Sequence, residues 1–152
     1  MSDPDDIPGW QRLDADVTTS GRLAPADPSR LAAIGVRSVI NLALTESPSA
    51  LADEPALLAA AGIAYTHIPV PFDAPRGAHF AAFCDALAVA PRPVHVHCIM
   101  NWRVSAFFYR YHVEVLDMAE PLARSLMERQ WSPESNDSKD APAWARFIRG
   151  QD

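Results

Sequence analysis

The chain has 152 residues, of which 49% are hydrophobic and 21% are charged, so it is long and apolar enough to form a globular domain with a buried core. Thirteen basic residues against nineteen acidic ones give a formal net charge of -6, which excludes a broad basic surface for nucleic acid or an anionic membrane. The composition also excludes intrinsic disorder, and no internal repeat divides the chain, so we predict a single domain over residues 1–152.

The N-terminus and the cysteines give further expectations. The segment MSDPDDIPGW is acidic and lacks the basic and apolar regions of a signal peptide. No stretch approaches the ~18 apolar residues that a membrane span requires. We therefore expect a cytoplasmic protein that acts without a membrane. Its two cysteines, Cys84 and Cys98, need separate explanations, because a domain of this size requires no disulfide bond in a reducing compartment.

Proline, glycine and apolar spacing predict a helix and then a β-α-β unit in the first half of the chain. Asp27 before Pro28 has the features of a helix cap, and glycines stop both predicted helices. The predicted elements are a helix from Asp27 to Gly35, a strand at 36–42, a helix that starts at Ser47-Pro48 and ends at Gly62, and a strand at 63–70.

The second half of the sequence predicts helices on either side of one short strand. A helix at 77–90 is indicated by apolar residues at helical spacing, namely Phe80, Phe83, Cys84 and Leu87, so Cys84 belongs to a buried stripe. The β-branched run VHVHC at 94–98 predicts a strand, and its residues are followed by a helical pattern from Arg103 onward.

The tail predicts a helix at 120–130, a polar loop at 132–140 and a last amphipathic turn. We expect Trp131 and Trp144 to pin this tail to the body of the domain. Strands that alternate with helices imply an α/β fold with a mostly parallel central sheet flanked by helices. Ligands bind such sheets beyond the carboxyl ends of the strands, and Cys98 lies at such an end.

The segment from His97 to Ser105 combines features that suit an oxyanion. Cys98 ends a strand, a tight turn follows, and Arg103 opens a helix. Free amides and the dipole at a helix N-terminus attract anions, and a guanidinium can bind two phosphate oxygens at once. The same field favours a thiolate, which can attack phosphorus when a nearby carboxyl group protonates the leaving oxygen. Asn101 tolerates the left-handed backbone that a tight anion nest needs.

These features belong to a wider resemblance. The chain resembles the cysteine-dependent protein tyrosine and dual-specificity phosphatase superfamily, especially its compact bacterial branch, over nearly its whole length. The segments that carry the resemblance are TSGR at 19–22, GVRSVINLAL at 35–44, GIAYTHIPVPFDAP at 62–75, VHVHCIMNWRVSAF at 94–107, and WSPE and WARFI near the end. The resemblance implies a dual-specificity phosphatase-like fold and the hydrolysis of a phosphorylated protein or a small phosphomonoester.

The resemblance also implies a role for each site residue. Cys98 is the expected nucleophile, Asp73 the general acid and then base, and Ser105 the residue that eases thiolate departure. His97 is expected to hydrogen-bond within the loop and to tune the thiolate. Arg103 is expected to hold the phosphate together with the backbone amides of the turn, which are those of Ile99, Met100, Asn101, Trp102 and Arg103. No metal and no cofactor is implied.

Other carboxylates are weaker candidates for the general acid. Asp85 follows Cys84 on a predicted helix, where a solvated position is expected, and Asp53 and Glu54 lie on the second helix. For Asp73, the alternative role is turn formation before Pro75.

The cysteine loop departs from the superfamily pattern, which is His-Cys, five residues, Arg, and then Ser or Thr, with glycine usual in the loop. Arg103 lies five positions after Cys98 instead of six, no glycine intervenes, and Val104 follows the arginine, although Ser105 keeps the family distance from the cysteine. Either the loop is one residue shorter and holds a smaller or differently placed oxyanion, or it keeps its length with Arg103 shifted off the helix entrance.

Other interpretations stay open. Rhodanese sulfurtransferases resemble this arrangement with a cysteine loop one residue shorter than that of the phosphatases, and would form a persulfide on Cys98. A phosphate-binding module without turnover is a further alternative.

His95 and His97 share a strand face and could bind zinc with Cys98, although zinc ligands usually come from separated elements. A disulfide between Cys84 and Cys98 would make a redox switch, although a core position is favoured for Cys84.

Overall fold

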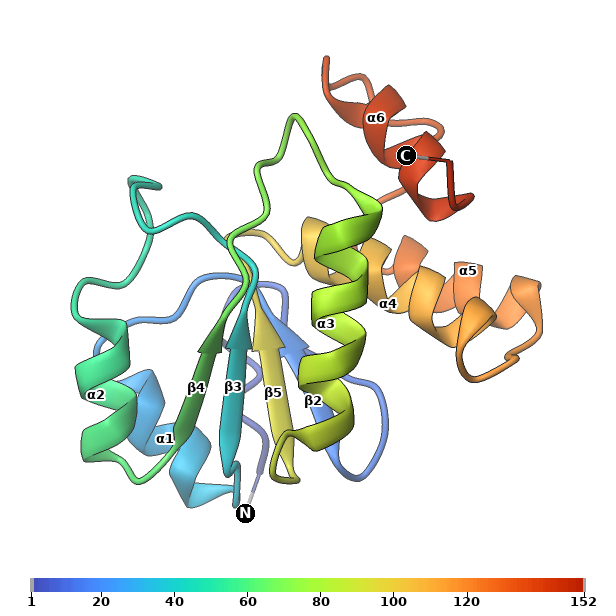
Figure 1. The fold of residues 1–152 in the computed structure, drawn as a ribbon. Helices are drawn as coiled ribbons and strands as arrows, with labels where there is room; N and C mark the ends of the chain where they lie inside the picture. Colours follow the sequence, from blue (N-terminus) through green and yellow to red (C-terminus); the bar gives the residue numbers. More distant parts are fainter. Residues whose placement is uncertain (1, 152) are drawn as a thin grey trace.

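The computed structural model describes residues 2–151, which form an α/β fold around a five-stranded sheet with the strand order β1-β2-β5-β3-β4 (Figure 1). Every neighbouring pair is parallel except β1 and β2. The strands are β1 (Gln11–Arg12), β2 (Val17–Ser20), β3 (Ser38–Asn41), β4 (Ala64–His67) and β5 (Val94–His97). The predicted α/β class and mostly parallel sheet are confirmed, whereas β1 and β2 were not predicted.

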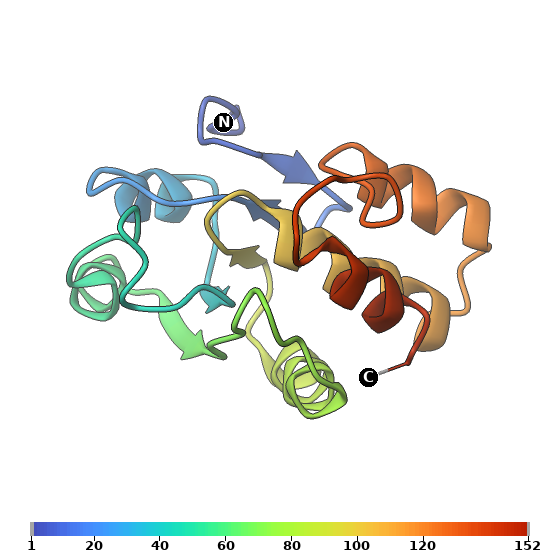
Figure 2. The same cartoon turned by 90° about the horizontal axis from the view of Figure 1, so that it is seen from above.

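Helices cover both faces of the sheet. The helices are α1 (Asp27–Ala33), α2 (Glu54–Ala60), α3 (Gly77–Val89), α4 (Trp102–Glu114), α5 (Glu120–Glu128) and α6 (Ala141–Ile148). Seen from above, α1 and α2 lie on one side of the sheet and α3 and α4 on the other, with α5 and α6 packed beside α4 (Figure 2). None of these helices is long and apolar enough to cross a membrane.

The alternation of side chains along the strands divides the core into two layers. In β3, Val39 packs in the layer with α1 and α2, and Ile40 packs in the layer with α3 and α4. In β5, Val94 and Val96 join the second layer. His95 and the next histidine, His97, therefore point toward α1 and α2, where they are almost fully buried.

Two predicted helix starts were wrong. Asp27 does not cap α1 but is its first residue, and its carboxylate accepts hydrogen bonds from the Ala24 amide at 2.7 Å and from Arg30 at 2.9 Å. Helix α2 begins at Glu54 instead of at Ser47, because Asp53 has a left-handed backbone with φ 58° that a right-handed helix cannot include. Residues 47–53 consequently form a loop beyond the sheet.

The tail is anchored by two tryptophans, as predicted. Trp131 is 5% exposed and donates through Nε1 to the carbonyl of Trp102 at 2.9 Å. Trp144 is fully buried and donates through Nε1 to the carbonyl of Phe72 at 2.7 Å. The rings of Trp102 and Trp131 stack with their planes 2° apart and their centroids 4.7 Å apart. The tail thus holds both the start of α4 and the turn after β4.

His95 is held as a neutral imidazole. Ser20 donates its hydroxyl hydrogen to the Gly21 carbonyl, so its oxygen accepts from His95 Nε2 at 2.8 Å, and Thr18 donates to Nδ1 at 2.8 Å. Trp10 stacks on the ring with a centroid separation of 5.2 Å. Complete burial, reinforced by His97, lowers the pKa of His95 well below 6.5.

This burial predicts a loss of stability in mild acid. Below about pH 6.5 the unfolded chain takes up a proton at His95 that the folded chain cannot, so the free energy of unfolding should fall by up to about 1.4 kcal/mol per pH unit. Urea denaturation between about pH 5.5 and about pH 7.5 measures this slope. His95→Gln should reduce it more than His79→Gln does, because burial also lowers the pKa of His79 and of His112 but less strongly; equal slopes in all three proteins would contradict the assignment.

Candidate active site

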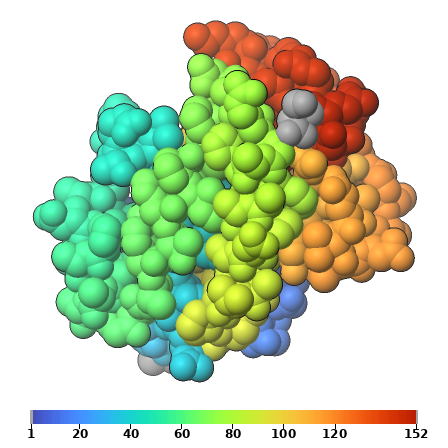
Figure 3. All heavy atoms as spheres, in the orientation of Figure 1, coloured from blue at the N-terminus to red at the C-terminus, as the bar shows by residue number. Residues whose placement is uncertain are grey.

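A pocket of about 300 Å³ lies beyond the carboxyl ends of the parallel strands, which point toward the upper side of the molecule in Figure 1. The loop after β3 and the turn after β4, cyan and green in the upper part of Figure 3, both contribute residues to its lining. Its lining residues are Ser47, Pro48, Ser49, Phe72, Cys98, Ile99, Met100, Trp102 and Arg103. Its walls are mainly apolar, and Arg103 is the one charged residue among them; we call it the Cys98 pocket.

Cys98 directly follows β5 at the bottom of this pocket. The residue is 1% exposed, and its amide donates to the Ser20 carbonyl of the neighbouring strand at 3.3 Å. It begins a short turn, residues 98–101, which we call the Cys98 loop, and α4 starts at the next residue, Trp102. The N-terminal end of α4, with its free amides, therefore lies beside the thiol.

The Cys98 loop is held from outside by the N-terminal segment and β2. Asn101 has the expected left-handed backbone, with φ 65°, and its Nδ2 donates to the Gly9 carbonyl at 2.7 Å and to Thr19 Oγ1 at 3.0 Å. Gly21 lies so close that a Cβ there would be 2.5 Å from the Ile99 carbonyl oxygen. Only glycine allows this approach, which fixes the shape of the loop.

Arg103 lies in the first turn of α4, so the short spacing does not move it away from the helix entrance. The residue is 7% exposed, and its Nη1 donates to the carbonyl of Val70 at 3.0 Å. The guanidinium lies 5.9 Å from the ring centre of Phe72. The structure thus matches the shorter-loop alternative, with a fixed guanidinium on one wall of the pocket and the thiol at its bottom.

His97 lies behind the Cys98 loop and is paired with a carboxylate. Its Nε2 donates to Glu54 Oε2 at 2.7 Å, and its Nδ1 lies 3.1 Å from the Cys98 carbonyl oxygen. Both side chains are almost completely buried. Glu54 was considered in the sequence only as a weak candidate for the acid; the pairing instead makes it the residue that orients His97 and, through it, the peptide after Cys98.

Removal of this carboxylate should destabilise the protein. Glu54→Ala leaves the buried Nε2–H of His97 without its acceptor, so the free energy of unfolding should fall by about 1–3 kcal/mol. Glu46→Ala, which changes an exposed glutamate of the same β3–α2 loop, is the matched control and should change it by less than about 0.5 kcal/mol. Urea denaturation of both variants measures the difference, and equal effects would show that the pair has no structural role.

Asp73 lies on the turn after β4, next to Phe72 on the pocket wall, but its own side chain is exposed and is not part of the lining. No carboxylate is found among the described residues that line the Cys98 pocket. The structure therefore brings Cys98, Arg103 and the loop residues together, and it leaves Asp73 at the rim.

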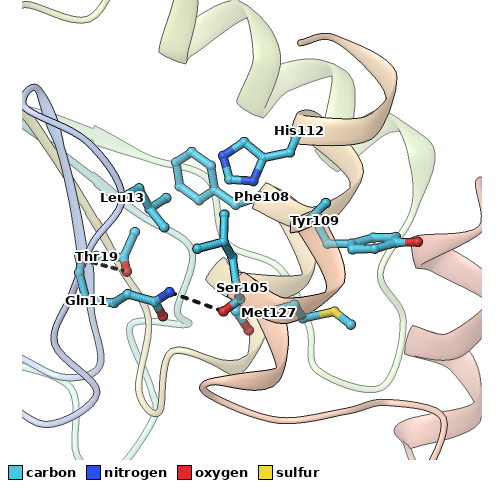
Figure 4. Close-up of a pocket in the computed structure, with 10 residues that line it drawn as sticks. Gln11, Leu13, Thr19, Ser105, Phe108, Tyr109, His112 and Met127 are labelled. Carbon is cyan, nitrogen blue, oxygen red and sulfur yellow. Dashed lines mark hydrogen bonds between the residues drawn. The ribbon is translucent and has the colours of Figure 1, made fainter. Parts of the chain in front are cut away.

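Ser105 faces away from the Cys98 pocket. It lines a separate cavity of about 10 Å³ between β1, α4 and α5, together with Gln11, Thr19, Tyr109 and Met127 (Figure 4). Its hydroxyl donates to the Trp102 carbonyl at 3.1 Å, inside the first turn of α4.

The zinc and disulfide alternatives gain no support. Within residues 2–151, no three histidine, cysteine or acidic side chains are grouped so that they could hold a metal ion. Cys84 and Cys98 are both free, and Cys84 packs half-buried against the core. Burial, followed by the charge of Asp85, raises the pKa of the Cys84 thiol, as expected for an unreactive core cysteine.

Comparison with known proteins connects this site to a family. The family model described as "Beta-lactamase hydrolase-like protein, phosphatase-like domain" matches residues 10–109. A DUF442 protein described as a phosphatase, from Shewanella putrefaciens CN-32, has a solved structure with 26% sequence identity and a TM-score of 0.80, covering 96% of this chain and 94% of that one. No curated protein matches the chain in sequence.

Two more distant structures share the fold. P. aeruginosa TpbA has 22% identity and a TM-score of 0.75, with 100% of this chain and 89% of that chain covered. The core catalytic domain of the PP-IP phosphatase SIW14 from S. cerevisiae has 14% identity and a TM-score of 0.75, with 96% and 88% covered. The chain therefore belongs to the family of beta-lactamase hydrolase-like proteins with a phosphatase-like domain.

Proposed function

We propose that this phosphatase-family protein hydrolyses phosphomonoesters through a phosphocysteine formed on Cys98. One observation carries the proposal: the Cys98 thiol, the N-terminus of α4 and the fixed guanidinium of Arg103 meet in one pocket. Free amides and a guanidinium are the groups that bind a phosphate dianion, and a thiolate beneath them is placed to attack phosphorus.

The proposed reaction has two steps. First, the Cys98 thiolate attacks phosphorus, the bond from phosphorus to the ester oxygen breaks, and Asp73 gives its proton to the leaving oxygen. Second, a water molecule attacks the phosphocysteine, the carboxylate of Asp73 takes the proton of that water, and the sulfur–phosphorus bond breaks. Inorganic phosphate and the thiolate are released. Arg103 and the amides of the Cys98 loop hold the charged oxygens in both steps.

Asp73 has to reach the pocket from its exposed position on the turn after β4. Asp73 directly follows Phe72, which lines the pocket, so the proposal requires the exposed Asp73 side chain to turn toward the leaving oxygen when a substrate is bound. In the same proposal Ser105 stabilises the first turn of α4 and does not assist the departure of the thiolate, because its hydroxyl is hydrogen-bonded to the carbonyl of Trp102.

Asp73→Asn tests the assignment of the acid. An acid that protonates the leaving group must itself be protonated, so the rate falls as the pH rises through its pKa, and an amide removes this basic limb of the pH–rate profile. With p-nitrophenyl phosphate, whose leaving group is already acidic, we expect a loss of about tenfold together with a flat basic limb. Asp85→Asn is the matched control on α3, and an unchanged basic limb in Asp73→Asn would rule out Asp73 as the acid.

The pocket favours an aromatic phosphomonoester, free or on a protein. Phe72, Trp102 and Met100 give an apolar entrance, and Arg103 is the one cation of the lining. A ring can pack against such walls, whereas a polyphosphate would need several cations. Among structures that share the fold, a TpbA variant is in complex with pTyr, and SIW14 acts on a substrate class named PP-IP, which supports a phosphate ester as the substrate.

The test is hydrolysis of p-nitrophenyl phosphate by metal-free protein between about pH 5 and about pH 8, with and without vanadate. We expect turnover that vanadate blocks, because vanadate occupies the same oxyanion site. Turnover that vanadate does not affect, or no turnover at all, would overturn the proposal. The location of this activity in the cytoplasm stays a prediction from the sequence.

Sulfur transfer is a second candidate, favoured by the short Cys98 loop and by the lack of a carboxylate in the described lining of the pocket. The Cys98 thiolate would attack the outer sulfur of thiosulfate, the sulfur–sulfur bond would break, and sulfite would leave. An acceptor thiolate would then remove the outer sulfur of the Cys98 persulfide. No step needs a proton donor, so transfer of sulfur from thiosulfate that is insensitive to Asp73→Asn would favour this candidate. Binding of vanadate without either reaction would indicate a phosphate-binding module.

A further inference from the structure

A second hollow adjoins the Cys98 pocket. It has a volume of about 310 Å³ and is lined by Pro8, Arg22, Leu23, Ala24, Asp27 and Ser49. Ser49 also lines the Cys98 pocket, so the two hollows meet at this residue. A ligand whose phosphate occupies the Cys98 pocket can therefore extend past Ser49 toward Arg22.

Arg22 is fixed beside the Cys98 loop through its backbone. Its amide donates to the Ile99 carbonyl at 2.9 Å, and the preceding Gly21 lies against the same carbonyl, with no room for a Cβ. The side chain is exposed, and within residues 2–151 no hydrogen bond or ion pair occupies its guanidinium. The structure thus presents an unpaired cation on a rigid support next to the pocket.

The other charged side chains near the hollow are held in ion pairs. Asp27 is 3% exposed, and its two oxygens accept from the Ala24 amide and from Arg30. Arg30 is also paired with Asp6. Asp6 and Asp27 thus share Arg30 as their partner, whereas the guanidinium of Arg22 is occupied by no described group and can attract an anion in a protein whose net charge is -6.

We propose that Arg22 and Ser49 form a second anion subsite, which selects phosphomonoesters whose leaving group carries a carboxylate. The proposal rests on the proposed function, because it assumes that the phosphate is held at Cys98 and Arg103. The guanidinium of Arg22 binds the carboxylate with two parallel hydrogen bonds, and the Ser49 hydroxyl can donate a further one. No bond is made or broken at this subsite; it contributes to affinity and selectivity.

Two pairs of probes test the subsite, and the members of each pair differ in one carboxylate. The first pair is N-acetyl-O-phosphotyrosine and its C-terminal amide, and the second is a phosphotyrosine dipeptide amide that ends in glutamate or in glutamine. Binding is measured by calorimetry to Cys98→Ser, which keeps the pocket but cannot turn the probes over. In at least one pair we expect the acid to bind about fivefold more tightly than the amide, which is the upper range for a partly exposed ion pair.

Variants of Arg22 then test whether Arg22 causes the preference for the acid over the amide. Arg22→Gln should bring the acid-to-amide ratio close to one, and Arg22→Lys should give an intermediate ratio, because it keeps the charge but loses the paired donors. Arg37→Gln, which removes an exposed arginine just before β3, at the opposite end of the sheet, should keep the ratio of the parent.

The outcomes separate the subsite from the proposed function. Tight binding of acids and amides with equal affinity, or a preference that survives Arg22→Gln, would overturn the subsite and leave the phosphate site intact. Failure of Cys98→Ser to bind any of the probes would overturn both proposals together.

Discussion

Replacing Cys98 with serine should reduce the hydrolysis of p-nitrophenyl phosphate by at least about a thousandfold while the protein still binds vanadate or phosphate. The hydroxyl of serine is a far weaker nucleophile than a thiolate, and no other described side chain in the pocket can replace it. The amides of the Cys98 loop and Arg103 are unchanged, so the oxyanion site should persist. Steady-state kinetics and calorimetry with inorganic phosphate measure the two effects.

Cys84→Ser is the matched control for this prediction. Cys84 lies on α3, half-buried against the core, and its thiol has no place in the pocket. Its replacement should leave turnover within about twofold of the parent, at some cost in stability. Loss of activity in Cys84→Ser equal to that in Cys98→Ser, or full activity in Cys98→Ser, would contradict the assignment of the nucleophile.

Arg103→Lys should lower kcat/KM for p-nitrophenyl phosphate by about a hundredfold and weaken the binding of vanadate. Lysine keeps the positive charge but has a single donor group on a flexible chain, so it cannot bond the Val70 carbonyl and two phosphate oxygens together. Loss of one fixed donor to a developing charge commonly costs about 10²–10³ in rate. The same measurements on Arg37→Lys, far from the pocket, give the control.

The effect of Arg103→Lys also decides how the short loop works. A hundredfold loss shows that Arg103 contacts the transferred group although it follows Cys98 one position early. A variant as active as the parent would mean that the guanidinium serves only to fix Val70 and the wall of the pocket, and that the α4 amides bind the phosphate alone.

Local sequence patterns predicted most of the fold. The helix at 77–90 and the strand at 94–98 were correct to within one residue at each end, because apolar spacing, β-branched residues and prolines all agreed there. The start of α2 was misplaced by the Ser47-Pro48 signal, since the left-handed backbone of Asp53 depends on the packing of the loop. Strands β1 and β2 are short and partly polar, so their sequence carries no strong alternation.

The sequence predicted the part of the site whose residues are neighbours in the chain, and not the part that the fold brings together. Cys98, Asn101 and Arg103 are neighbours in the sequence, and a strand-turn-helix pattern brings them together in space. Glu54 is the first residue of α2 and Arg22 lies in the loop after β2, so their proximity to the Cys98 loop depends on the order of strands in the sheet. A buried glutamate at the start of an apolar helix and an arginine after Gly21 were the available signals, but neither indicates a partner by itself.

The central claim is that phosphate is transferred to Cys98. Protein mixed with p-nitrophenyl phosphate, quenched in acid within milliseconds and digested, should give a peptide containing Cys98 with the added mass of one phosphoryl group. Asp73→Asn should accumulate more of this species than the parent if it slows the second step. The absence of any phosphorylated Cys98 peptide during turnover, or the appearance of a persulfide on Cys98 after exposure to thiosulfate with no phosphorylated form, would contradict the account.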